Sequence, residues 1–224
     1  MKKSITLSLA LILALSLAAC DATNTQRGAT TAAQTTSASS ASDPSRTADP
    51  PDDDNFAFSE IADLVFEFSS GVGAWRTEVQ ICPDGTFSGY FSDSDMGEVG
   101  DGYPGGIVYE CAFSGKFTAP EKTGEHEYTM KCVSLTQEGT VGAEKIMDGM
   151  KYITSEPYGF DSADEFKLYL PGKSLSDLPE AFLDWVRYSV EGSDELTFYG
   201  LYNVGGEMGF SSYMRMPEAD EAIS

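Results

Sequence analysis

Apolar and polar residues alternate along several segments of the chain, and this period of two predicts half-buried β-strands. The clearest alternation runs from Ile107 to Phe117, and another covers Trp75 to Ile81. Asp84-Gly85 follows the second segment and Gly205-Gly206 lies near the C-terminus. Both pairs favour tight hairpins, because glycine accepts positive φ. Strands joined by short turns predict an antiparallel meander.

Shorter segments extend this pattern to both halves of the chain. They lie at 87–91, 128–132, 166–170, 196–202 and 208–214. The count is about eight or nine strands, and closure into a barrel would remove the exposed edges of such a meander. The expected fold is therefore mainly β, an antiparallel meander that closes into a β-barrel.

Helical periodicity is concentrated at about 177–187. Asp177 is an N-cap acid, Pro179 stands in the first turn, and Glu180 completes a capping box. These signals predict one α-helix. A second, weaker helical turn is predicted over 142–147.

The predicted strand at 196–202 is apolar on both of its faces. A strand of this kind is covered on both sides. We therefore expect the helix that carries Phe182 and Trp185 to pack on its outer face.

The N-terminus has a different pattern. Lys2 and Lys3 precede an apolar segment from Ile5 to Leu17, as in a secretory signal. The segment is short for a spanning helix. It ends in Leu17-Ala18-Ala19-Cys20, which resembles the lipobox of bacterial lipoproteins.

In lipoproteins the lipobox cysteine becomes the first mature residue and carries a diacylglyceryl group, with acyl chains such as palmitate. The resemblance implies a signal peptide at 1–19, lipidation of Cys20 and attachment to the extracytoplasmic face of the cell membrane. An uncleaved signal anchor is the alternative.

Residues 20–55 are expected to form a disordered linker behind the lipidated cysteine. Ala, Ser and Thr make up most of this segment, and it contains no aromatic residue, Leu, Ile or Val. Because it has little apolar surface to bury, it cannot offset the entropy of ordering. The folded domain is predicted over 56–224.

Charge restricts the partners of this chain. It has 36 Asp and Glu against 14 Lys and Arg, a net charge of -22. Such acidity argues against nucleic acid as a partner, because phosphate binding requires a basic surface. The absence of a second long apolar run argues against several membrane spans.

Three short motifs add resemblances. Gly73-Ala74-Trp75 is similar to the Gly-x-Trp feature of lipocalins, where the Trp closes one end of a barrel. Strands are predicted after the helix here, so the implied fold is calycin-like rather than a lipocalin. Pro157-Tyr158-Gly159-Phe160 and 168–172 resemble segments of uncharacterised secreted bacterial lipoproteins, which implies no activity.

A calycin-like barrel offers its interior as a binding site. The candidate contacts for a small apolar ligand are the aromatic side chains of Trp75, Tyr109, Phe113 and Tyr128. The same side chains could instead fill the core.

Cys82, Cys111 and Cys132 remain when Cys20 is lipidated. A turn at Glu121-Lys122 would pair residues whose numbers sum to 243, and 111 plus 132 gives this sum. Cys111 and Cys132 would then be neighbours and could form a disulfide. A loop two residues longer would shift the register, and three reduced thiols are the alternative.

No catalytic or metal-binding set emerges from the sequence, and no cofactor is implied. His126 is the single histidine of the chain, and no Gly-x-Ser-x-Gly motif accompanies it. Asp93, Asp95, Glu98 and Asp101 lie in one loop, but their spacing departs from that of a calcium-binding EF-hand. A solvated acidic loop is favoured.

The resulting hypothesis is a membrane-anchored, non-enzymatic ligand-binding or interaction module outside the cytoplasm. One alternative is a structural lipoprotein with a filled barrel that binds an envelope protein. A second is an envelope hydrolase that uses paired carboxylates.

Overall fold

The computed structural model describes residues 56–71 and 73–215. The predicted signal peptide, Cys20 and the linker of residues 20–55 lie outside the described residues. The strands are β1 (Leu64–Ser69), β2 (Trp75–Ile81), β3 (Thr86–Asp95), β4 (Ile107–Phe117), β5 (Glu121–Gly124), β6 (Glu127–Gln137), β7 (Glu144–Met147), β8 (Met150–Thr154), β9 (Glu165–Tyr169), β10 (Gly200–Asn203) and β11 (Met208–Met214). The helical elements are η1 (Phe58–Glu60), η2 (Leu175–Asp177), α1 (Glu180–Val186) and η3 (Arg187–Ser189).

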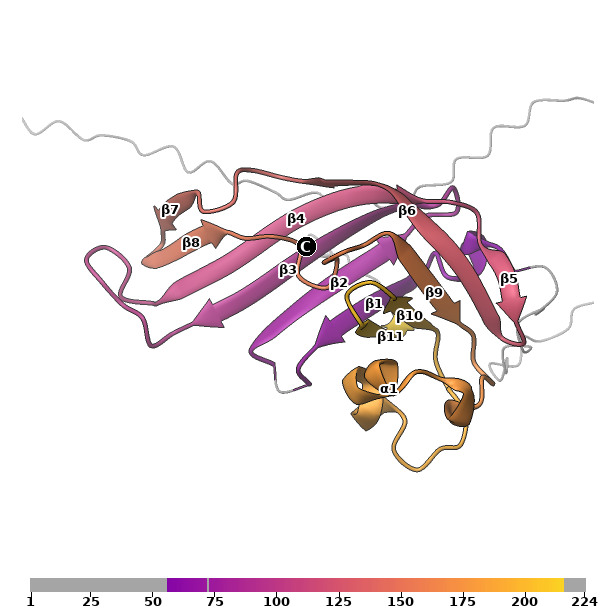
Figure 1. The fold of residues 1–224 in the computed structure, drawn as a ribbon. Helices are drawn as coiled ribbons and strands as arrows, with labels where there is room; N and C mark the ends of the chain where they lie inside the picture. Colours follow the sequence, from indigo (N-terminus) through magenta and orange to yellow (C-terminus); the bar gives the residue numbers. More distant parts are fainter. Residues whose placement is uncertain (1–55, 72, 216–224) are drawn as a thin grey trace, which may run out of the picture. The chain divides into compact units, whose positions relative to one another are not determined.

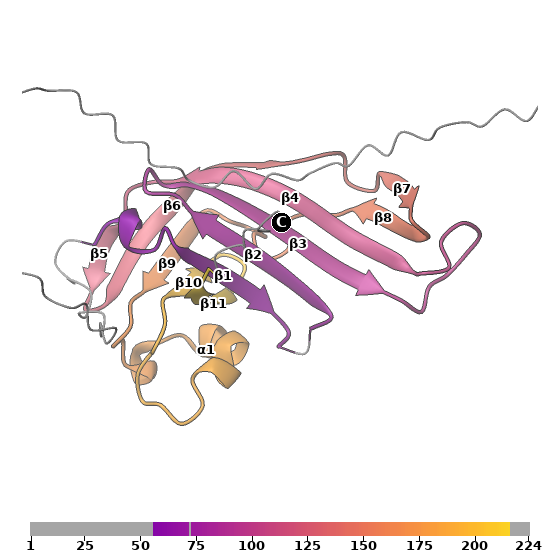
Figure 2. The same cartoon turned by 180° about the vertical axis from the view of Figure 1, so that it is seen from behind.

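The described residues form a closed antiparallel barrel (Figure 1). Around the ring the order is β1-β2-β3-β4-β6-β9-β10-β11, and β11 pairs with β1. Each neighbour in this ring follows the previous one along the chain, so the predicted meander is confirmed. Figure 2 shows the same ring from behind, with β7 and β8 lying beside β4.

The alternating segments were reliable guides to the strands. β2, β4 and β11 have the predicted bounds, and β9 differs from its prediction by one residue at each end. Of the predicted strand at 196–202, only residues 200–202 are in a strand, and they belong to β10. Leu196 instead exchanges backbone hydrogen bonds with the 172–173 segment.

The helical turn predicted over 142–147 is wrong, because β7 occupies that segment and pairs with β8. Asp148 and Gly149 connect the two strands with φ values of 51° and 78°. Two successive positive φ angles are typical of a tight hairpin turn. The Asp-Gly pair was therefore the informative signal.

The predicted helix is present but shorter than 177–187. α1 begins at Glu180, with Pro179 as its N-cap and no side-chain cap, and Asp177 ends η2 instead. The expected capping box does not form. The extended backbone of Leu178 separates the two helical segments.

The predicted pairing of Cys111 with Cys132 is also wrong. Gly124 lies opposite Glu127, so the chain turns at Glu125-His126 rather than at Glu121-Lys122. This turn and a register shift after Lys116 place Phe117 opposite Cys132. Cys111 lies six positions before Phe117, about 20 Å along the strand. Both cysteines are free.

The barrel interior is packed by aromatic side chains that lie opposite glycines. Phe87 faces Gly115 and Phe113 faces Gly89 across β3 and β4. Each ring occupies the space that a Cβ at the facing glycine would need. Large and small residues thus alternate across the two strands, which lets the rings interdigitate.

Residues 155–164 between β8 and β9 form what we call the barrel plug. Phe160 in the plug is 3% exposed, and its ring lies 4.9 Å from that of Phe113 and 5.2 Å from that of Phe166. The buried Asn203 side chain holds the plug by donating to the carbonyl oxygens of Gly159 and Asp161, at 3.1 and 2.7 Å. The plug therefore contributes to the barrel core.

A second core lies outside the barrel, beneath α1. Phe182 is fully buried there and packs against Tyr169 and Tyr202, with ring centroids 5.1 and 5.8 Å away. This contact agrees with the expectation that the helix covers the outer face of the late strands. No helix within the described residues combines the length and apolar character of a membrane span.

Candidate functional site

The four candidate ligand contacts are part of the packed core or lie against it. Phe113 and Tyr128 are 3% and 4% exposed, and Trp75 and Tyr109 pack partly buried against the same cluster. Tyr128 contacts Phe56, with ring centroids 5.1 Å apart. These four residues therefore contribute to the hydrophobic core, and their role in ligand binding stays a prediction.

Trp75 lies in an aromatic group at one end of the barrel. Its ring is 4.9 Å from Phe68, 5.0 Å from Tyr158 and 6.1 Å from Trp185. The Trp185 indole donates a hydrogen bond of 2.9 Å to the Glu207 carbonyl oxygen. The plug and α1 thus both supply rings to the surroundings of Trp75.

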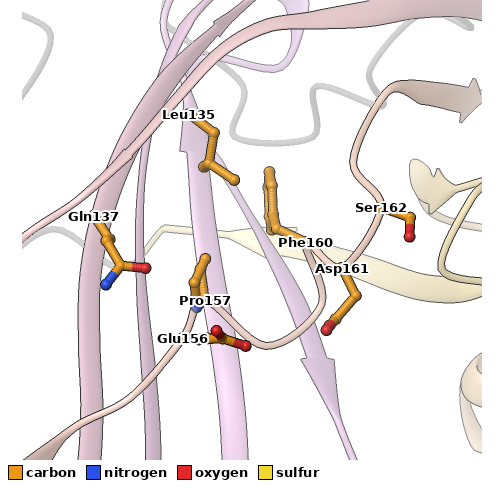
Figure 3. Close-up of a pocket in the computed structure, with 7 residues that line it drawn as sticks. All are labelled: Leu135, Gln137, Glu156, Pro157, Phe160, Asp161 and Ser162. Carbon is orange, nitrogen blue, oxygen red and sulfur yellow. The ribbon is translucent and has the colours of Figure 1, made fainter. Parts of the chain in front are cut away.

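A pocket lies between β6 and the barrel plug, and we call it the plug pocket. Its volume is about 410 Å³ and it is open to solvent. Figure 3 shows side chains from β6 on one side and from the plug on the other. The lining residues are Leu135, Gln137, Glu156, Pro157, Phe160, Asp161 and Ser162.

Within the described residues, one side of β6 lacks a neighbouring strand next to this pocket. β9 pairs with β6 only from Glu127 to Lys131, whereas β4 pairs with the other side as far as Gln137. The Glu138 amide donates to the Ala112 carbonyl oxygen at 2.8 Å. In an antiparallel ladder the bonded residues alternate. Thr136 therefore bonds β4, and the backbone groups of Leu135 and Gln137 point away from it.

We call this side of residues 133–137 the β6 edge. The last backbone bond before it joins the Cys132 amide to the Asp164 carbonyl oxygen, at 3.0 Å. Beyond that bond, no strand among residues 56–71 and 73–215 pairs with the edge. Val133 and Leu135 are 58% and 38% exposed there.

The surroundings of the plug pocket are acidic. Glu156 and Asp161 line it, and none of its lining residues is basic. Burial, with smaller contributions from the charges of Glu138 and Glu156, raises the pKa of the nearby Cys111 thiol to about 11. The site therefore combines apolar and anionic groups.

The two free thiols are poor candidates for nucleophilic chemistry. Burial raises the pKa of Cys132 as well, with a contribution from Asp164. A cysteine with a raised pKa is protonated at neutral pH, and the protonated form is a weak nucleophile.

The acidic loop and the histidine form no metal centre in the described region. The Asp95 carboxylate accepts hydrogen bonds from the amides of Gly97 and Glu98, at 2.9 and 3.2 Å. It therefore stabilises its own turn. His126 occupies the turn between β5 and β6 with a φ of 54°, and no group of three potential metal ligands occurs among the described residues.

A cluster of ions lies near the same turn. The Glu127 carboxylate is 2.7 Å from the Lys167 ammonium and 3.2 Å from that of Lys173. Burial opposes ionisation of Glu127, but the hydrogen bonds and charges of the two lysines outweigh it and lower its pKa. The cluster joins β6, β9 and the segment after β9.

The period-two pattern does not predict the β6 edge or the lining of the plug pocket. Pro157-Tyr158-Gly159-Phe160 carries only a resemblance to secreted lipoproteins. An apolar aromatic segment between two predicted strands was the available signal, because exposed connections are generally polar. No protein family, no curated protein and no solved structure matches this chain.

Proposed function

We propose that this protein is a non-enzymatic interaction module, held on the extracytoplasmic face of the cell membrane by a lipidated Cys20, which binds an envelope protein at its barrel surface. The lipobox resemblance supports the anchor. The filled interior supports a partner outside the barrel rather than a ligand inside it.

The observation that carries this choice is the position of Phe160. Its ring packs among those of Phe87, Phe113, Phe166 and Phe210, at centroid distances of 4.9 to 6.0 Å. A small ligand in the barrel would have to displace this buried ring. The volume that a ligand-binding barrel leaves empty is filled here by the chain itself.

The geometry gives less support to a carboxylate-dependent hydrolase. Glu156 and Asp161, the acids of the plug pocket, are both exposed. A catalytic acid of this class is usually held in an apolar environment that favours its protonated form.

Chemical crosslinking in intact native cells tests the proposed function. We expect a lysine-reactive reagent to join the mature protein to one envelope protein, with crosslinked positions on the barrel surface. Organic extraction of the purified protein should recover no small molecule in stoichiometric amount. A stoichiometric extracted ligand, or the absence of any crosslinked protein, would refute the proposal.

A further inference from the structure

On the side of β6 that faces β9, the strand pairing ends at Lys131, although β6 itself continues to Gln137. The backbone groups of Leu135 and Gln137 point away from β4, and β9 has already separated from β6 at this position. Unpaired donors and acceptors of this kind are a template for another strand.

In the part of the chain that the structure describes, the β6 edge also lacks the usual protection against strand addition. Natural edges carry lysine, proline or other charged residues, or are covered by another element. Residues 133–137 are Val-Ser-Leu-Thr-Gln, which contains neither a charge nor a proline. Their β-branched and apolar residues favour an extended conformation.

The plug pocket supplies chemical selectivity beside this edge. Figure 3 shows Leu135 and Gln137 facing Pro157 and Phe160 across the pocket, with Glu156 and Asp161 on the plug side. The apolar groups would contact an aliphatic or aromatic side chain. The carboxylates would attract Lys or Arg, and the net charge of -22 would favour approach of a cationic partner.

From this juxtaposition we infer that the β6 edge and the plug pocket form one docking site, which receives an extended segment carrying Lys or Arg from the partner protein. The incoming segment adds a strand to β6 and places its cationic side chains against Glu156 and Asp161. This inference rests on the proposed function and specifies the surface and the partner's chemistry.

Two synthetic peptides of about eight residues probe the site, one alternating Lys with Val and the other alternating Glu with Val. The lipidated mature protein in detergent micelles is titrated with each peptide. We expect the Lys peptide to bind at least about tenfold more tightly, with an affinity that falls as salt increases. Hydrogen exchange measured by mass spectrometry should slow in peptides covering 133–138.

A pair of proline substitutions separates docking from folding. Gln137→Pro removes an amide that points away from β4, whereas Thr136→Pro removes one that bonds β4. A proline is tolerated where the missing N–H would have faced solvent. Gln137→Pro should keep the wild-type circular dichroism and weaken binding of the Lys peptide by about tenfold or more. Thr136→Pro should lower the melting temperature.

A second variant retains the backbone and removes the charges. Glu156→Gln with Asp161→Asn should abolish most of the preference for the Lys peptide, while Glu191→Gln with Asp194→Asn, at exposed acids outside the pocket, should leave it unchanged. Equal binding of both peptides, unaltered binding by folded Gln137→Pro, or protection elsewhere would overturn the docking site. If the native partner nevertheless crosslinks to another face, the proposed function survives.

Discussion

At the scale of single residues, two glycines let α1 approach the barrel. A Cβ placed on Gly200 would lie 2.5 Å from Cζ of Phe182, and one on Gly209 would lie 2.9 Å from Cδ2 of the same ring. Phe182 is fully buried, so its ring has little freedom to move. The glycines of β10 and β11 therefore provide the surface on which the helix packs.

Gly200→Ala should lower the free energy of unfolding by about 1–3 kcal/mol, because the added methyl group overpacks the contact with Phe182. Phe182→Leu in the same chain should recover part of this loss. Gly124→Ala is the control, since the nearest atom to its added Cβ is 3.5 Å away. Urea unfolding measures the free energy of unfolding of each variant. Equal stability of Gly200→Ala and wild type would contradict this account of the contact.

The ion cluster of Glu127 predicts a pH dependence. Because the folded protein lowers the pKa of Glu127, its contribution to stability is complete above the unfolded value of about 4.3 and declines as pH falls through the lower folded value. Glu127→Gln should lose about 2 kcal/mol at neutral pH, the scale of hydrogen bonds to charged groups.

Urea unfolding of wild type and Glu127→Gln across this acidic range measures the effect. The difference in stability between them should shrink as the carboxylate becomes protonated in the folded protein. Exposed Glu121→Gln serves as the control. A difference that stays constant down to about pH 2 would show that the Glu127 charge is not its source.

At the scale of elements, the barrel plug is held by hydrogen bonds from two strands. Asn203 in β10 donates to the Gly159 and Asp161 carbonyl oxygens, and Thr77 in β2 donates to that of Tyr158 at 2.6 Å. Asn203→Ala would leave two carbonyls without these donors and should cost about 2–3 kcal/mol of stability.

Hydrogen exchange tests whether the plug opens independently of the rest of the barrel. Hydrogen exchange in Asn203→Ala should accelerate over 156–164 more than over β2 and β3, because the plug loses its direct contacts. Thr77→Val should accelerate the same segment through an independent bond. A uniform acceleration over the whole barrel would contradict the idea of a separately held plug.

At the scale of the whole molecule, the proposed lipid on Cys20 would hold the barrel at the membrane surface. Two acyl chains suffice for stable attachment, since each buried methylene contributes about 0.8 kcal/mol. Cys20→Ala should release the protein from the membrane fraction or leave it as the unprocessed precursor. Cys132→Ala is the control, because it removes a cysteine and leaves Cys20 in place. Fractionation and intact mass measure both, and a processed Cys20→Ala variant still bound to membranes would refute the anchor.

The alternation of apolar residues predicted much of the barrel, because it reports which face of a strand is buried. It missed β1, whose first three residues, Leu64, Val65 and Phe66, are all buried and do not alternate. It also misplaced the turn after β4, since Glu121 to Gly124 continues as β5 before His126 adopts a positive φ. That error shifted the predicted partner of Cys111.

The sequence by itself determined the mainly β character, the order of the meander and the acidic surface, since periodicity and charge are properties of neighbouring residues. Only the tertiary structure decided that Phe160 enters the barrel and that no strand of residues 56–71 and 73–215 pairs with the β6 edge. Both outcomes depend on where distant segments pair. A bulge or a turn displaced by a few residues alters those pairings while the local pattern stays the same.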